Sequence, residues 1–223
     1  MSLMKSKGNM YSFVTHTWNA IKGECSHDCR YCYMKKFGNL LPIRLDPKEL
    51  KMNLGKDNFI FVGSGTDLWA VDVPSDWITR VLDHCDRFDN RYLFQSKNPE
   101  RLLEFKDHPV MEKSIVCTTI ETDTFYPDIM GNTPSPRGRA RAMQKLAKLG
   151  MRTYVTCEPL MRFDLTGLVE LIRMCSPVQV NIGRNSRKDI TLPEPTGNEV
   201  RALIAELGKF TTVEVKANAK CWV

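Results

Sequence analysis

The 223-residue sequence is 42% hydrophobic, has a formal net charge of +6 and contains eight cysteines. This length and apolar content suit one globular domain with a sizeable core, or at most two small ones. No apolar run approaches the roughly 20 residues that a membrane helix needs, so the composition argues against a membrane protein.

The cysteine pattern and the N-terminal sequence bear on the cellular compartment of the protein. No signal peptide is visible, so we expect a soluble, cytoplasmic protein. Clustered cysteines in a long, core-rich chain without a secretion signal indicate metal binding rather than disulfides. Residues 1–3 precede a second methionine and are expected to be a cloning remnant, with 4–223 as a single domain.

Apolar, β-branched runs alternate with helical patterns along the chain. This alternation is typical of βαβ units and a parallel sheet. We expect helices from Pro47 onward and at 76–88, 99–105, 137–149, 165–175 and 196–207. We expect strands at 11–18, 58–62, 91–96, 114–121, 152–158, 178–182 and 212–217.

Almost every expected strand ends in a polar residue, as at Asp67, Lys97, Glu121 and Glu158. In a β/α barrel the working residues lie at the carboxyl ends of the strands. A complete eight-unit barrel typically needs about 250 residues, more than this chain has. The sequence therefore predicts an α/β fold: a partial (β/α)6-7 TIM-like barrel with parallel strands and an open side.

Three cysteines, Cys25, Cys29 and Cys32, lie close together in GECSHDCRYCY. A structural zinc ion needs four protein ligands, commonly as two paired motifs, and one Cys-x-x-Cys pair is present here. A Cys3His zinc site with His27 or His16 is an alternative. A disulfide-exchange site has no role for a third thiol. A [4Fe–4S] cluster held by three thiolates keeps one iron free to bind a small chelating molecule.

The spacing Cys-x3-Cys-x2-Cys, with an aromatic residue at Tyr31, resembles the motif of the radical S-adenosylmethionine (SAM) superfamily. Within that superfamily the sequence resembles the spore photoproduct lyase-like branch and a phage-associated radical-SAM-like family of unknown substrate. The second resemblance rests on TWNAIKGEC at 17–25, CRYCY at 29–33, LFQSKNPERL at 93–102, TTIET at 118–122 and VTCEPLM at 155–161.

This resemblance implies an enzyme with two cofactors, a [4Fe–4S] cluster and SAM. Cys25, Cys29 and Cys32 would ligate the cluster, and an electron from it would cleave SAM. The resulting 5′-deoxyadenosyl radical would abstract hydrogen from a substrate, in lyase- or isomerase-type chemistry. The implied partner is an electron donor such as flavodoxin or ferredoxin, and no further catalytic residue is assigned.

The resemblance also implies contacts to SAM. Tyr31 and Tyr33 would flank the adenine. A Gly-Gly-Glu-like segment usually follows the second strand, and its place is taken here by Gly63, Ser64, Gly65, Thr66 and Asp67. The small residues permit close backbone approach. Because the acid is displaced, the group that contacts the SAM amine stays open.

Three further strand ends supply candidate contacts to SAM. Ser96 and Lys97 end the third strand, and Lys97 offers a point charge to the SAM carboxylate. Glu121 would accept hydrogen bonds from the ribose hydroxyls, and strand alternation places Thr119 on the same face. Glu158 could bind either SAM or the substrate.

Two basic stretches bear on the class of substrate. The basic stretches RGRARAMQKLAK at 137–148 and GRNSRK at 183–188 could bind a polyanion, although such a helix is also typical of a solvated surface. Together with the lyase resemblance, they favour nucleic acid, in repair or base modification. The alternatives are a radical SAM enzyme acting on a small molecule or peptide, and a non-catalytic binding module stabilised by zinc or a cluster.

Overall fold

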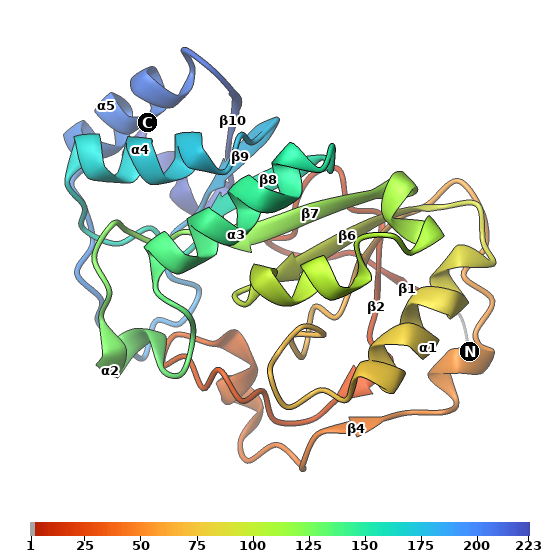
Figure 1. Ribbon diagram of the computed structural model, residues 1–223. Coiled ribbons are helices and arrows are strands. Elements are labelled where there is room, and N and C mark those ends of the chain that lie inside the picture. Colours follow the sequence, from red (N-terminus) through yellow and green to blue (C-terminus); the bar gives the residue numbers. More distant parts are fainter. Residues whose placement is uncertain (1–2) are drawn as a thin grey trace.

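The computed structural model describes residues 3–223, so Met1 and Ser2 of the expected cloning remnant lie outside the described residues. Within 3–223, eight strands form one sheet in the order β1-β2-β5-β6-β7-β8-β9-β10 (Figure 1). Neighbours from β2 to β10 are parallel, and β1 is antiparallel to β2. The strands are β1 (Met4–Lys5), β2 (His16–Trp18), β5 (Phe59–Val62), β6 (Arg91–Ser96), β7 (Ser114–Thr119), β8 (Thr153–Cys157), β9 (Gln179–Ile182) and β10 (Thr212–Val215).

The longer helices alternate with these strands and lie on one side of the sheet in Figure 1. In the described chain the edge strands β1 and β10 do not pair, so the sheet is an open barrel. The predicted α/β partial barrel with parallel strands is therefore confirmed. The helices are α1 (Ser75–Asp86), α2 (Pro127–Met130), α3 (Pro136–Lys148), α4 (Leu165–Met174) and α5 (Gly197–Leu207).

Shorter elements complete the chain. A two-stranded ribbon pairs β3 (Ile21–Lys22) with β4 (Arg44–Leu45). One prediction is corrected here: the helix expected from Pro47 is a single 3-10 turn. Among residues 3–223, no helix is both long and apolar enough to cross a membrane. The 3-10 helices span Tyr33–Phe37, Glu49–Lys51, Pro99–Phe105, Pro109–Lys113 and Ala217–Trp222.

Strand alternation divides the apolar residues between two cores. Successive side chains of a strand point to opposite faces. Ile60 and Val62 of β5 therefore pack into the main core with the helices, together with Tyr92, Phe94, Val116 and Val155. Phe59 and Phe61 face the concave side, where they cluster with Leu93, Ile115, Cys117 and Tyr154.

The concave side is filled by the segment that precedes β2. We expected one strand over 11–18, but β2 covers His16–Trp18. Tyr11 and Val14 leave the sheet and pack into the concave cluster, where the ring of Phe13 lies 5.0 Å from that of Phe59. Apolar side chains suit both a strand and a segment packed inside the barrel, so the sequence pattern of these residues does not distinguish the two conformations. Apolar side chains of this segment therefore pack against the concave face of the sheet.

Candidate functional site

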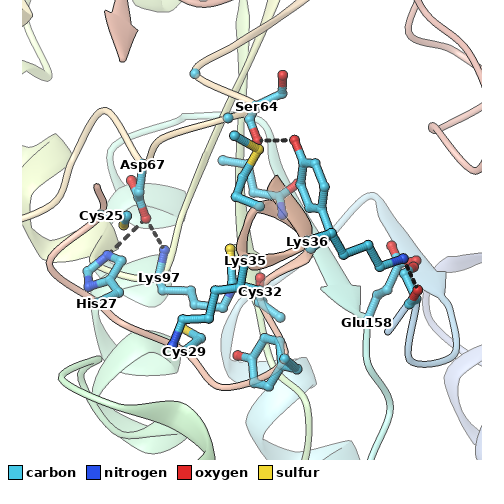
Figure 2. A pocket seen from close by; sticks show the side chains of 18 of the residues that line it. Cys25, His27, Cys29, Cys32, Lys35, Lys36, Ser64, Asp67, Lys97 and Glu158 are labelled. Carbon is cyan, nitrogen blue, oxygen red and sulfur yellow. Dashed lines mark hydrogen bonds and ion pairs between the residues drawn. The ribbon is translucent and has the colours of Figure 1, made fainter. Parts of the chain in front are cut away.

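A cavity of about 730 Å³ lies at the carboxyl ends of the parallel strands (Figure 2). Its wall combines the cysteine loop with the ends of β5, β6, β7 and β8. Every predicted site residue except Glu121 lines it: Cys25, Cys29, Tyr31, Cys32, Tyr33, Gly63, Ser64, Gly65, Asp67, Ser96, Lys97, Thr119 and Glu158. Residues from five separate segments of the sequence therefore share one cavity.

The cysteine loop is held from outside the cavity by the segment around α2. The Arg30 amide donates to the carbonyl of Ile129 at 2.9 Å, and the Asn132 amide donates to the carbonyl of His27 at 2.8 Å. Between these contacts lies Gly131, with a φ of 63°. A Cβ atom on Gly131 would overlap the carbonyl oxygen of His27. The loop and this segment therefore fit together only with glycine at 131.

Two thiols of the loop, those of Cys25 and Cys29, are buried enough to resist ionisation. Burial, opposed by the backbone amides of His27 and Asp67, raises the pKa of Cys25 to about 12. Burial likewise raises the pKa of Cys29. Such thiols are protonated near neutral pH and become thiolates when a metal supplies positive charge.

The three thiols of the loop all line the cavity. Within residues 3–223, no three Cys, His, Asp or Glu side chains converge closely enough to hold one metal ion. Three thiolates that line one cavity are a suitable donor set for a [4Fe–4S] cluster.

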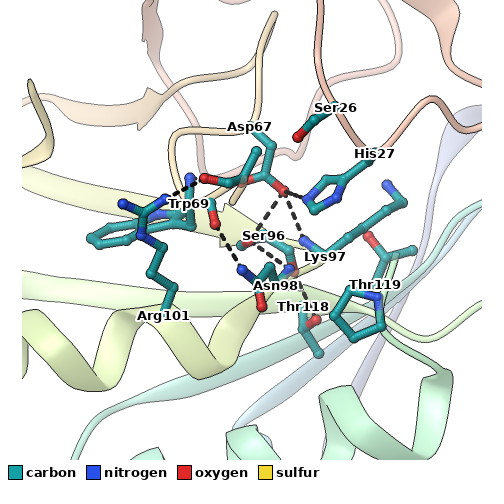
Figure 3. A network of polar contacts seen from close by, with 12 residues as sticks. Ser26, His27, Asp67, Trp69, Ser96, Lys97, Asn98, Arg101, Thr118 and Thr119 are labelled. Atoms are coloured by element: carbon teal, nitrogen blue, oxygen red, sulfur yellow. Dashed lines mark hydrogen bonds and ion pairs between the residues drawn. The ribbon is translucent and has the colours of Figure 1, made fainter. Parts of the chain in front are cut away.

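Asp67 connects the cysteine loop to the ends of two strands (Figure 3). Its Oδ2 lies 2.9 Å from Nε2 of His27 and accepts from the hydroxyl of Ser96 at 3.0 Å and the amide of Lys97 at 2.9 Å. Its Oδ1 accepts from the amide of Trp69 at 2.9 Å. Burial opposes ionisation, but these bonds and the charge of His27 hold the pKa of Asp67 below its usual value.

These contacts bear on whether Asp67 is the group that contacts the amine of SAM. A carboxylate has about four acceptor sites, and Asp67 uses four within the protein. Asp67 therefore braces the cavity wall. The geometry does not favour it as the group that meets the amine.

Lys97 presents a positive charge to the cavity. Its Nζ lies 5.3 Å from the centre of the Tyr31 ring, and within the described residues it forms no ion pair. Burial disfavours the ammonium, but the charges of Cys29 and Glu121 outweigh it and raise the pKa of Lys97. On the neighbouring strand, the hydroxyl of Thr119 is buried without a partner in the described chain. A cation and an unsatisfied hydroxyl on one wall suit a polar, anionic ligand.

Glu158, on the opposite wall, is held by residues from both ends of the chain. Its carboxylate accepts from Nζ of Lys216 at 2.5 Å and from the side-chain amide of Asn9 at 2.7 Å. Asn218 donates to it at 3.3 Å. Glu158 therefore reaches the cavity with its negative charge balanced by Lys216. These contacts connect the end of β8 to the N-terminal segment and to the segment that follows β10.

Comparison with solved structures places this architecture among known folds, whereas no family model and no curated protein matches the sequence. Spore photoproduct lyase with bound AdoMet and a dinucleoside spore photoproduct superposes with a TM-score of 0.64 at 16% identity, covering 91% of this chain and 64% of that one. The C140A lyase mutant gives 0.69 at 15% identity, covering 93% and 78%. The chain has the fold of spore photoproduct lyase.

SuiB of Streptococcus suis bound to S-adenosylmethionine is similar over 89% of this chain and 46% of its own length. Its TM-score is 0.55 and its identity 10%. The predicted resemblance to the radical SAM superfamily is confirmed at the level of the fold. The chain spans 64% of the lyase that holds AdoMet, so activity and substrate remain matters of proposal.

Within this barrel, Glu121 is not where we predicted. β7 ends at Thr119, so the strand alternation that was to bring Glu121 to the cavity does not extend that far. Glu121 is fully buried. It forms an ion pair with Arg139 at 2.8 Å and accepts a hydrogen bond from the hydroxyl of Tyr31. We therefore correct its expected contact with ribose: Glu121 lies behind the wall and supports Tyr31.

Sequence reasoning missed several residues that shape the site. Arg139 belongs to the basic stretch 137–148, which we considered a solvated helix or a polyanion patch, yet its side chain is completely buried. That stretch forms α3, and its Arg139 donates to the carboxylate of Glu121 and to the carbonyl of Thr119, which lines the cavity. Gly131 has a positive φ, and a single glycine between two loops does not by itself predict this backbone conformation. Other missed residues are Asn9, Tyr11, Gln95 and Lys216.

Proposed function

We propose that this protein is a radical SAM enzyme. Cys25, Cys29 and Cys32 hold a [4Fe–4S] cluster, and Lys97 binds the carboxylate of SAM. When bound, these cofactors supply a 5′-deoxyadenosyl radical that abstracts hydrogen from the substrate. The observation that carries the proposal is the three thiols facing the same carboxyl-end cavity as a half-buried lysine that forms no ion pair in the described chain.

The other wall residues orient these groups. The hydroxyl of Tyr33 donates to the carbonyl of Ser64 at 2.8 Å, which fastens the cysteine loop to the glycine-rich segment. Gly63 has a φ of 79°, which favours glycine. Asp67 fixes Ser96 and the backbone of Lys97, as described above. A cavity walled in this way keeps water and stray donors from a reactive radical.

Nucleic acid is the substrate class that we propose, acted on by lyase- or isomerase-type chemistry. Lys7, Lys36 and Lys97 line the cavity, and none forms an ion pair within residues 3–223. The net charge of +6 of the whole chain also favours a polyanionic substrate. The similar lyase structure holds a dinucleoside photoproduct. We place the activity in the cytoplasm, where cysteines stay reduced, with flavodoxin or ferredoxin as the class of electron donor.

Replacing Cys29 with alanine is expected to abolish iron binding and SAM cleavage together, because two thiolates cannot replace three. The measurement is iron content and 5′-deoxyadenosine yield after anaerobic reconstitution and dithionite reduction. Cys221→Ala, which alters an exposed cysteine near the chain end, serves as the matched control and should retain both. Survival of SAM cleavage in Cys29→Ala would refute the ligand assignment.

The same assay tests the substrate class. Single-stranded and duplex oligonucleotides should raise the 5′-deoxyadenosine yield if nucleic acid is the substrate. A yield that does not respond to nucleic acid, in an enzyme that still cleaves SAM, would indicate a small molecule or peptide instead.

Replacing Lys97 with methionine is expected to weaken SAM binding by roughly 10- to 100-fold. A hydrogen bond to a charged group is worth about 1.5–3 kcal/mol, and methionine keeps the length of the side chain without its charge. Equilibrium dialysis with labelled SAM gives the affinity. Iron content measured on the same sample should stay at the parental level, and unchanged SAM affinity would contradict the role of Lys97.

A further inference from the structure

A segment with exposed apolar side chains protrudes beside the cavity. Residues 33–41 follow the last cysteine of the loop and return to the barrel through the β3–β4 ribbon (Figure 1). The amide of Glu24 donates to the carbonyl of Leu41 at 2.8 Å, which anchors the base of the segment. Phe37 is 70% exposed, Leu41 63% and Tyr33 42%. Such side chains concentrated in one short segment indicate a contact surface.

The same segment carries positive charge toward the cavity. Lys36 lines the cavity, and its Nζ donates to the carbonyl of Ser186 at 2.7 Å. An ammonium has three donors, and in the described chain Lys36 forms no ion pair, so it can also bind an anion. Lys35 is exposed and pairs with Asp28 at the surface. An exposed aromatic ring therefore lies next to lysines at the mouth of the proposed radical site.

We propose that residues 33–41 bind single-stranded nucleic acid, with Phe37 stacked on a base and Lys36 near a phosphate. This inference rests on the proposed function, because it names how the substrate meets that same site. Proteins that bind single strands combine basic side chains, which contact the backbone, with aromatic side chains, on which the bases stack. In a duplex the bases stack on one another, and a base must leave the stack before it can enter a cavity of this kind.

A single strand suits this surface better than a folded protein partner. A stable protein interface buries about 800 Å² per partner, spread over 20–30 residues. Here the exposed apolar side chains belong to a nine-residue segment, which matches the few nucleotides that one stacking platform holds. Lys7, Lys36 and Lys97, the cavity lysines without an ion pair in the described chain, complement a phosphodiester backbone.

The first test replaces Phe37 with alanine. We expect the affinity for a fluorescein-labelled single strand of roughly 12 nucleotides to fall about 5- to 150-fold, because base–aromatic stacking is worth about 1–3 kcal/mol. Phe37→Trp should restore it. Leu149→Ala, which removes another exposed apolar side chain at the opposite end of the barrel, should bind like the parent. Equal affinities for Phe37→Ala and Leu149→Ala would overturn the proposal.

The second test measures salt dependence. Loss of one phosphate contact lowers the slope of log K against log salt by about 0.7 for a single strand. Lys36→Ala should show this decrease. Lys56→Ala, which changes an exposed lysine ahead of β5 and far from the cavity, should not. An unchanged slope in Lys36→Ala would contradict the phosphate contact.

These results separate this inference from the proposed function. If Phe37→Ala binds oligonucleotides like the parent while SAM cleavage is intact, the surface is wrong and the enzyme assignment stands. If oligonucleotide binding depends on Phe37 but no variant binds iron or cleaves SAM, the enzyme assignment fails and the surface stands. If oligonucleotides do not bind and an acidic electron-transfer protein binds through Phe37, the surface belongs to that protein and the proposal is refuted.

Discussion

Replacing Gly131 with alanine is expected to remove most of the iron that the protein binds, although Gly131 does not line the cavity. A Cβ atom at this position would overlap the carbonyl oxygen of His27 and lie 2.9 Å from the carbonyl carbon and oxygen of Asp28. All three are backbone atoms of the cysteine loop, so no side chain can rotate away. The loop must shift between Cys25 and Cys29, and their sulfur atoms move with it.

A matched control separates this clash from the ordinary cost of a positive φ. Gly150 has a φ of 85°, and a Cβ atom there would meet nothing within 4 Å. Gly150→Ala therefore carries only the backbone strain, about 1–2 kcal/mol. We expect Gly150→Ala to melt slightly earlier than the parent and to bind iron normally. Iron per chain and the thermal unfolding midpoint are the two measurements, and equal iron content in both variants would contradict the clash.

The parts of this molecule that follow from local sequence were predictable. Apolar runs bounded by turn residues gave the strands of the parallel sheet, because a strand buried on both faces must be apolar throughout. The position of Lys97 directly after one of these runs placed it at the carboxyl edge, where the cavity lies. The spacing of Cys25, Cys29 and Cys32 placed three thiols on one loop.

The parts that depend on contacts between distant segments were not predictable from these patterns. Tyr11 has the apolar neighbours of a strand residue, and only the curvature of the sheet creates the inner space that it fills. Glu121 was assigned by extending an alternation beyond the end of its strand. Arg139 looks like any arginine of a basic helix, because its partner lies in another segment of the chain. Each error concerns a tertiary contact that overrides a local rule.

The buried pair of Glu121 and Arg139 leads to the second large prediction. Both side chains are completely inaccessible to solvent, and they lie 2.8 Å apart. Arg139 also donates to the carbonyl of Thr119, so it binds the end of β7. Replacing Arg139 with methionine leaves the carboxylate of Glu121 buried without its counter-charge. Breaking such a pair from one side costs about 3–5 kcal/mol, which is a large part of the stability of a domain.

Removing both charges should cost less than the two single changes added together. Glu121→Gln leaves a buried guanidinium without its carboxylate, whereas the double variant with Arg139→Met leaves no isolated charge. Urea unfolding of the four proteins in this cycle gives the coupling energy, which we expect to be about 1–3 kcal/mol. Simple additivity would show that the two groups are not a coupled ion pair.

The same cycle tests whether the pair supports the cysteine loop. Tyr31 lies between Cys29 and Cys32, and its hydroxyl donates to Glu121. Arg139→Met leaves the acceptor of this hydroxyl on a buried, uncompensated carboxylate, which favours its movement, whereas glutamine at 121 offers a neutral acceptor. We therefore expect the double variant to bind more iron than Arg139→Met at a temperature where both are folded. If iron content instead follows only the unfolding free energy, the pair stabilises the barrel without positioning Tyr31.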